Sequence, residues 1–171
     1  MANQAGKEIA REMLAKMAEF RRTCEGLDEE SSTYAPEGRW SPKQVISHLC
    51  GPEGVGLLPT FKAFIEQDTP EIDIEAENPY WSTKRSNMSL AELFAEFDLE
   101  YRHIAAFIEG LSDEQLSRRA HIPMLKDTPF GEYPTLAQWA AGLSGYHLGF
   151  HIDHMREILQ ALGLPGKKPD E

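Results

Sequence analysis

Apolar residues recur at every third or fourth position in four long segments of the chain, which is the spacing of an amphipathic α-helix. The segments cover residues 5–27, 41–67, 89–110 and 135–162, and glycine and proline interrupt the second between residues 51 and 56. Alternating strand patterns are few, so we predict an all-α fold. The simplest arrangement is a four-helix bundle with long loops and crossover connections.

Capping boxes mark where three of these helices begin. Each box pairs a serine or threonine with a glutamine or glutamate three residues later, and the boxes are Ser41–Gln44, Ser89–Glu92 and Thr135–Gln138. Such pairs satisfy backbone N–H groups that the first turn of a helix leaves without partners. Pro42 strengthens the first box, because proline suits the first helical position.

Two connections are long and lack helical periodicity. Residues 68–88 contain Pro70, Pro79, Tyr80 and Trp81. A loop of this length in a small domain is often functional or interfacial. We therefore expect it to line either a pocket or a dimer interface. Residues 118–134 are also irregular, and we predict a short strand or hairpin within residues 121–124.

The length and charge of the chain narrow its class. Its 171 residues most simply form one domain over residues 1–171, and the net charge of −11 argues against binding to nucleic-acid phosphates. No apolar run is long enough to span a membrane, and the polar N-terminus does not resemble a secretory signal. We expect a cytoplasmic protein. Cys24 and Cys50 lack zinc-finger spacing and are predicted to be reduced, buried thiols.

Half of the six histidines lie within residues 147–154. His147 and His151 are four positions apart and lie on one helical face, in the middle of an apolar stripe that also includes Leu143, Phe150 and Ile158. A neutral imidazole has one hydrogen-bond donor and one acceptor, and burying either without a partner costs free energy. Two histidines with this spacing can clamp one metal ion.

The third ligand could come from His154 or His48. His147 and His154 are separated by about 10 Å of helix rise, which is too far for His147, His151 and His154 to meet at one ion. A ligand from a facing helix avoids this problem, and His48 projects with the apolar residues of its own helix. We therefore predict a metal site at His48, His147 and His151. This set leaves a coordination position open, as in catalytic zinc sites.

Other polar residues near these ligands are weaker candidates. His154, Glu53 and Asp153 are candidates for contacts to the ligands or for the pocket, although Asp153 also suits a solvated surface position. His103 is expected at the surface, and nothing singles out His121. No residue is assigned a catalytic role.

Three glycines fall inside the last predicted helix, at positions 142, 145 and 149. Glycine costs about 1 kcal/mol relative to alanine in a helix interior. Close approach of a neighbouring helix or open space for a ligand would explain them, and we favour close approach.

The segment from Trp40 to Leu49, together with His147-x3-His151-x2-His154, resembles the DinB-like (YfiT/DinB) superfamily. The resemblance implies a four-helix bundle that holds a divalent metal through His48, His147 and His151, with zinc or nickel the usual occupant and iron or manganese as alternatives. It also implies a homodimer. Some members of this superfamily are S-transferases or isomerases that use low-molecular-weight thiols.

These observations predict a metal-dependent enzyme that activates a thiol or water for reaction with a small-molecule substrate. A thiol S-transferase is the favoured form. The alternatives are a metal-dependent hydrolase of a small substrate and a non-enzymatic, dimeric bundle that binds a metal or ligand.

Overall fold

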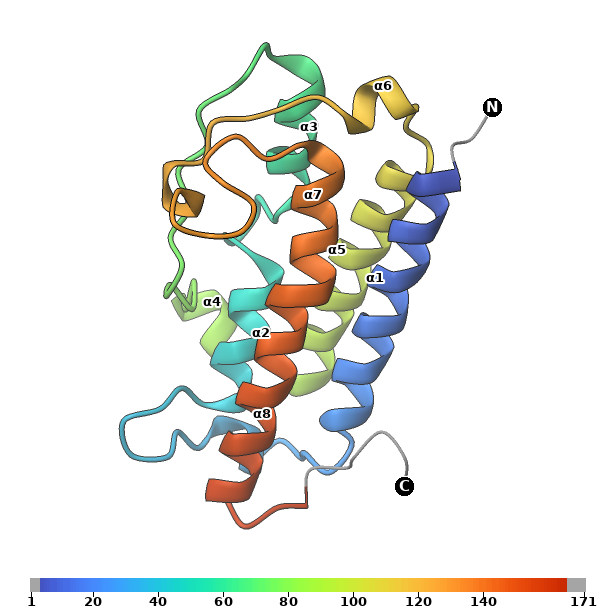
Figure 1. Ribbon diagram of the computed structural model, residues 1–171. Coiled ribbons are helices and arrows are strands. Elements are labelled where there is room, and N and C mark those ends of the chain that lie inside the picture. The colour runs from blue at the N-terminus through green and yellow to red at the C-terminus, as the bar shows by residue number, and fades with distance from the viewer. Residues whose placement is uncertain (1–3, 166–171) are drawn as a thin grey trace.

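The computed structural model describes residues 4–165, and the bundle predicted from the sequence is present (Figure 1). The single-domain prediction also covers residues 1–3 and 166–171, which lie outside the described residues. The long helices are α1 (Gln4–Thr23), α2 (Pro42–Cys50), α3 (Leu58–Glu66), α5 (Leu90–Glu109) and the last helix, which runs through α7 (Leu136–Ala141), η3 (Gly142–Leu148) and α8 (Gly149–Ala161). Shorter elements are η1 (Ser31–Thr33), α4 (Thr83–Ser86), α6 (Asp113–Leu116) and η2 (Pro123–Leu125).

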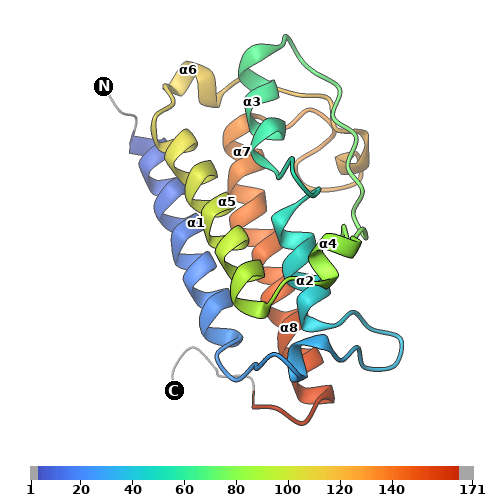
Figure 2. The same cartoon turned by 180° about the vertical axis from the view of Figure 1, so that it is seen from behind.

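The helices do not alternate simply up and down. Helix α1 and the last helix run in one direction, whereas α2 and α5 run in the other (Figures 1 and 2). Because α2 and α5 are parallel, the chain between α3 and α5 must return along the length of the bundle. This return is residues 67–89, so the predicted crossover connection is confirmed. None of the helices within residues 4–165 is both long enough and apolar enough to cross a lipid bilayer.

The most extensive helix–helix contact in the described residues lies between α1 and α5. Phe20 and Phe97 are fully buried there, with their ring centroids 5.2 Å apart. Burying side chains of this kind contributes about 1.5–3 kcal/mol each. Gly6 allows the helix backbones to approach, because a Cβ at this position would lie 2.6 Å from the carbonyl oxygen of Ile108.

All three predicted capping boxes are formed. In each, the hydroxyl accepts a hydrogen bond from the backbone N–H three residues on, and the glutamine or glutamate accepts one in return. The break after α2 is also present, at Gly51 with φ of 73°. The starts of α2, α5 and α7 were therefore predictable to within a residue.

The strand or hairpin predicted within residues 121–124 is wrong. Residues 123–125 form the short 3-10 helix η2, and the only pairings found in residues 4–165 are two isolated bridges, between Glu71 and His121 and between Arg119 and Thr135. Pro123 has no N–H to donate to a ladder, which limits a strand at this position. The bridge to Glu71 instead ties this loop to the crossover connection.

The last helix contains a π-helical segment, η3, where the sequence pattern predicts an uninterrupted α-helix. Its backbone bonds span five residues instead of four, which shifts the faces of the helix that follows. The apolar stripe continues through Leu148, Ile152, Met155 and Leu159, all buried, whereas Phe150 is 58% exposed. His151 is buried within this stripe at 4% exposure, whereas His147 and His154 are only partly buried.

The prediction that a neighbouring helix approaches the glycines of the last helix is wrong at all three positions, because the ring that faces Gly142 belongs to a loop. A Cβ on Gly145 or Gly149 would meet nothing within 4 Å, and one on Gly142 would lie 3.4 Å from the Phe130 ring. No neighbouring helix comes close to these positions within the described chain. Open space beside the histidines was the alternative, and it matches what the structure has at Gly145 and Gly149.

Candidate metal centre

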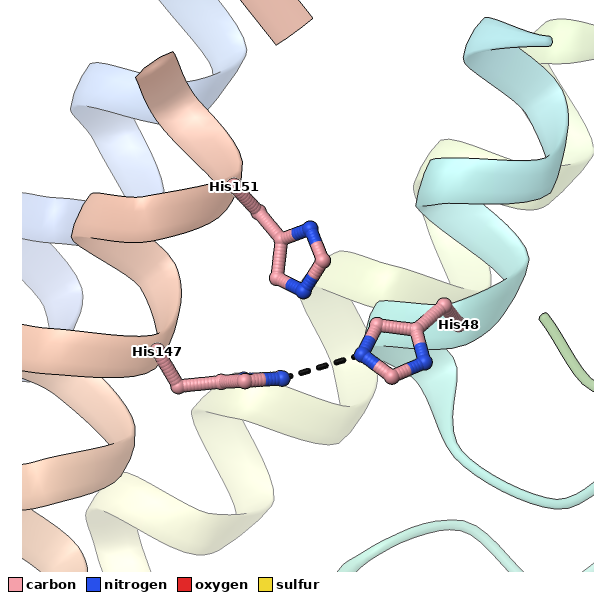
Figure 3. A group of neighbouring side chains, drawn as sticks. All are labelled: His48, His147 and His151. Carbon is pink, nitrogen blue, oxygen red and sulfur yellow. Dashed lines mark hydrogen bonds between the residues drawn. The ribbon is translucent and has the colours of Figure 1, made fainter. Parts of the chain in front are cut away.

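His48 of α2 and two histidines of the last helix, His147 and His151, meet between the two elements. One ring nitrogen of each lies within 4.8 Å of those of the others, so the group can hold a metal ion. Figure 3 shows these nitrogens directed toward a common space. Nε2 of His48 and Nε2 of His147 are 3.0 Å apart, although the two residues are separated by 99 positions in the chain.

The spacing and chemistry of these nitrogens fit a divalent metal. Two imidazole nitrogens bound to one zinc ion at about 2.0–2.1 Å lie about 2.9–3.4 Å apart when the angle at the ion is between about 90° and 110°. The distance of 3.0 Å between His48 and His147 falls within this range. Imidazole nitrogens suit zinc, nickel and iron. The donor set therefore fits the ions that the sequence predicts without selecting one of them.

Burial keeps the three imidazoles neutral, as metal ligands must be. Burial lowers the pKa of His147 to about 4, with a further contribution from His48 nearby. It lowers the pKa of His151 to about 2, helped by His147, His48 and His154. The pKa of His48 is also lowered by burial, partly offset by a hydrogen bond to a backbone carbonyl. At neutral pH each ring has a lone pair available.

A backbone carbonyl fixes the tautomer of His48. Its Nδ1 lies 2.7 Å from the carbonyl oxygen of Asn78, which can only accept a hydrogen bond. Nδ1 must therefore carry the hydrogen, and Nε2 presents its lone pair to the centre. His147 is held differently: its Nδ1 is buried and has no hydrogen-bond partner among residues 4–165.

The segment that carries Asn78 is held against α2 by buried polar side chains. The hydroxyl of Ser47 donates to the carbonyl oxygen of Pro79 at 2.6 Å. Arg85 of α4 is fully buried and donates to the carbonyl oxygens of Ser47 and Gly51, at 3.0 and 2.6 Å. Its other terminal nitrogen pairs with Glu96 of α5 at 2.6 Å. We call Ser47, Arg85 and Glu96 the polar clamp.

Tyr80 continues the same segment and has a φ of 47°, a left-handed conformation that is rare and strained for a large side chain. Its ring is parallel to that of His48, with an interplanar angle of 7° and centroids 6.1 Å apart. The strained backbone therefore brings an aromatic ring to the metal centre. This places part of the long loop at a pocket, one of the two alternatives that the sequence left open.

One side of the centre opens into a hollow of 640 Å³, which we call the polar cleft. His147, His151 and His154 lie in its wall, with the charged residues Glu37, Arg39 and Glu77. Three aromatic side chains also line it: Trp40, Tyr146 and Phe150. Tyr146 and Phe150 are 73% and 58% exposed, so the cleft is accessible to solvent.

A second hollow of 240 Å³ also adjoins the centre, and we call it the apolar pocket. His48 and His147 form the end nearest the centre. The rest of its wall comes mainly from apolar side chains of the loops and the last helix, including Ile74, Met124, Leu125, Phe130, Trp139 and Leu143. His147, Tyr146 and Ala76 line both hollows, so the two adjoin at the metal centre.

The weaker candidates are placed differently from one another. His154 lines the polar cleft, with its Nδ1 3.4 Å from that of His151. Asp153 instead pairs with Arg156 at 3.0 Å, with its side chain 75% exposed. Glu53 follows the left-handed turn at Gly51, and neither carboxylate lines the cleft or the pocket. Asp153 and Glu53 are therefore not part of the site that the structure forms.

The remaining histidines and the cysteines do not belong to the group of possible ligands. His103 is exposed on α5, as expected, and His121 stacks on Tyr133 with centroids 4.7 Å apart. Cys24 and Cys50 are free and buried, which confirms the prediction for them.

Sequence reasoning missed several residues of the site. Trp40 was recognised only as the start of the segment that resembles the DinB-like superfamily, but its ring centroid lies 5.3 Å from that of His48 and 6.0 Å from that of His154. Ser47 lies inside the Trp40–Leu49 segment but was given no role, and Arg85 belonged to no motif. The one available signal was the position of Arg85. It lies inside the long loop of residues 68–88, shortly before the helix that Ser89 caps.

Comparisons with known proteins agree on one family and one fold. A model of the DinB superfamily matches residues 14–155 of the chain. Among solved structures, the fold is similar to that of YfiT from Bacillus subtilis, described as a probable metal-dependent hydrolase with an unusual four-helix bundle topology. The TM-score is 0.74 at 19% sequence identity, and the match covers 96% of this chain and 91% of that chain. A search of curated proteins found no significant match.

Proposed function

The chain belongs to the DinB superfamily, and we propose that it is an enzyme that uses a divalent metal, held by His48, His147 and His151, to activate a small nucleophile. The observation that carries this proposal is the convergence of three imidazole nitrogens, from His48, His147 and His151, beside an open cleft that His147 and His151 line. A structural metal site is usually closed by four protein ligands. Here the described residues supply three, and the cleft gives a nucleophile access.

A bound divalent metal would lower the pKa of a water or thiol at its open position and so supply a nucleophile at neutral pH. The chain's own residues do the positioning. Asn78 holds His48 in the tautomer that leaves Nε2 free, and burial keeps His147 and His151 neutral. Zinc or nickel is the proposed occupant, with iron or manganese as alternatives.

We favour thiol S-transfer as the specific reaction, because two separate hollows meet at the histidines. A polar thiol fits the charged cleft, and the second substrate fits the apolar pocket. In the reaction, the thiol sulfur bonds to an electrophilic carbon while the bond from that carbon to its leaving group breaks. The leaving group takes the electron pair, and the thiol proton passes to solvent through the cleft.

Hydrolysis is the second candidate. It is supported by the fold similarity to YfiT, which is described as a probable metal-dependent hydrolase. Water would then take the place of the thiol, and the cleft is open to solvent. The low-molecular-weight thiol, the homodimer and the cytoplasmic location stay predictions.

The two reactions can be separated with the purified, metal-loaded protein. It should be incubated with 1-chloro-2,4-dinitrobenzene in the presence of cysteine or glutathione, and separately with p-nitrophenyl acetate without thiol. S-transfer predicts turnover only with thiol, abolished by removing the metal or by His147→Ala. Turnover of the ester without thiol would favour hydrolysis. Failure to retain a stoichiometric metal would contradict both.

A further inference from the structure

On the premise of the proposed function, we infer that the substrate carries an uncharged apolar group, about the size of a benzene ring or a short branched alkyl chain. This group occupies the apolar pocket, and the reacting end of the substrate lies beside His48 and His147. The inference names the substrate class that this centre accepts.

The position of the pocket makes it part of the reaction centre. The side chains of His48 and His147 form one of its ends, and Tyr80, which is stacked parallel to His48, forms an adjoining wall. A group held there is therefore within one side chain of the nitrogens that converge on the metal. The polar cleft is lined by His147 as well, together with His151, so a nucleophile in the cleft and a group in the pocket would meet at the centre.

The size of the pocket limits what fits. Its volume is 240 Å³, and an apolar cavity of about 150 Å³ is known to accommodate benzene. A single ring with one or two substituents, or a branched chain of similar bulk, would fill it. A longer chain would have to extend into the cleft, where the lining becomes polar.

The lining selects against charge. Among the described residues that form it there is no lysine or arginine, so an anionic group would lose its water without gaining an opposite charge, and the buried, unpartnered Nε1 of Trp139 carries no charge to offset this cost. Glu75 lies at the exposed rim and already accepts a hydrogen bond from Asn78, and Gln138 is engaged by the backbone of Thr135. Burial of an uncharged apolar group is the favourable alternative, at about 25 cal/mol per Å².

Two glycines of the π-helical segment provide a matched pair of variants. Gly142 lines the pocket and faces Phe130, so a leucine there would fill the pocket. Gly145 lies in the same segment, lines neither hollow and has open space around it. Gly142 has a φ of −65°, so a larger residue there needs no backbone change.

The experiment measures binding of toluene, benzoate and benzylamine by ligand-observed NMR to the wild type, Gly142→Leu and Gly145→Leu. Toluene should bind the wild type and Gly145→Leu alike, at least tenfold more weakly to Gly142→Leu, and more tightly than either charged analogue. Circular dichroism and thermal unfolding check that both variants fold. If toluene fails to bind the wild type, binds both variants equally, or binds no better than benzoate, the inference is wrong.

A second variant keeps the test informative if Gly142→Leu does not fold. Phe130→Ala removes the ring opposite Gly142 and enlarges the pocket, so the affinity for butylbenzene should rise relative to that for toluene. An unchanged ratio of the two affinities would contradict the inference.

Loading the protein with Co²⁺ separates this inference from the proposed function. Toluene in the pocket should show paramagnetic relaxation of its methyl protons, which displacement of Co²⁺ by Zn²⁺ removes. Binding without such relaxation, in protein that retains cobalt, would overturn the inference. Failure to retain cobalt while toluene still binds selectively would overturn the metal proposal and support the pocket.

Discussion

The two hollows that meet at the histidines differ in both lining and construction. The apolar pocket is formed mainly by carbon side chains, and part of its wall belongs to the segment of Asn78 and Tyr80 that the buried polar clamp holds against α2. The polar cleft is larger, and Arg39 in its wall forms an ion pair with Glu157 in which both side chains are well exposed, at 40% and 61%. An exposed pair of this kind contributes little to stability.

This difference indicates that the pocket and the cleft have different roles in binding. A wall held by buried, charge-assisted hydrogen bonds keeps one shape, which suits selection of a substrate by size. A cleft bordered by solvated charges and exposed aromatic rings adapts easily and admits polar molecules. The metal centre combines a fixed ligand with a less constrained one. The clamped segment fixes the orientation of His48, whereas the Nδ1 of His147 has no hydrogen-bond partner in residues 4–165.

Substitution of His147, which lines both hollows, should have the largest effect on metal binding. His147→Ala should lower the affinity for Zn²⁺ by more than about 100-fold, because loss of a ligand exceeds the 10–100-fold cost of losing an outer partner. Metal content by mass spectrometry and competition with a chromophoric chelator would measure this. His103→Ala, on the exposed face of α5, is the control and should retain the wild-type affinity. Equal affinities in the two variants would remove His147 from the site.

Breaking the polar clamp should have the next largest effect. Arg85→Met leaves the carbonyls of Ser47 and Gly51 without their donor and Glu96 without its partner. Unfolding free energy in urea should fall by about 2–4 kcal/mol, less than for a fully buried pair because Glu96 is partly exposed. Zinc affinity should fall about tenfold as the Asn78 carbonyl loses its position.

The control for the clamp is Arg118→Met, since Arg118 also donates to backbone carbonyls, those of Phe64 and Gln67 near the end of α3. It should leave zinc affinity unchanged. If both variants lose stability and affinity in the same proportion, the clamp supports the fold in general and not the orientation of His48.

A smaller change in the same clamp is Ser47→Ala, which removes the hydroxyl that donates to the carbonyls of Pro79 and Tyr80 and accepts a hydrogen bond from Arg85. We expect a stability loss of about 1–2 kcal/mol and a decrease of a few-fold in zinc affinity. Ser144→Ala is the matched control, because Ser144 is equally buried and bonds only to carbonyls of its own helix. An affinity change in Ser144→Ala as large as in Ser47→Ala would contradict the positioning role.

The polar cleft should tolerate substitution better than the pocket. Arg39→Ala should leave metal content and stability close to wild type, because its ion pair is exposed. If a charged thiol enters through the cleft, KM for glutathione should rise about two- to fivefold, the size expected for one exposed charge. Arg156→Ala, which changes an arginine outside the cleft lining, is the control for steady-state kinetics. A large loss of metal in Arg39→Ala would contradict this comparison, because it would mean that the cleft also holds the metal ligands in place.

The smallest change is expected when the native protein is treated with a thiol reagent, because both cysteines are buried. Burial raises the pKa of Cys50 to about 12, with Glu96 adding to the shift, and burial also raises that of Cys24. A raised pKa keeps a thiol protonated at pH 8, so neither should react with a disulfide reagent until urea unfolds the chain. Labelling followed by mass spectrometry measures this. Rapid labelling of the native protein would contradict this expectation, and a cysteine of the chain could then replace the external thiol as the nucleophile.

Much of the fold follows from local patterns in the sequence. The capping boxes at Ser41, Ser89 and Thr135 locate helix starts, because the hydrogen bonds that define them join residues three positions apart. The same short range explains why the spacing of His147 and His151 was informative. The π-helical segment was not predicted, since its register depends on packing against the rest of the bundle.

By itself, then, the sequence determined a helical bundle, the helix starts and three histidines suited to one metal. Only the tertiary structure decided what surrounds them. The Asn78 carbonyl that orients His48 lies 30 residues away, and the facing nitrogen of His147 lies 99 residues away. Such contacts depend on how the crossover connection closes over α2, and no local pattern of apolar and polar residues encodes that geometry. The two hollows exist only once the connection is closed.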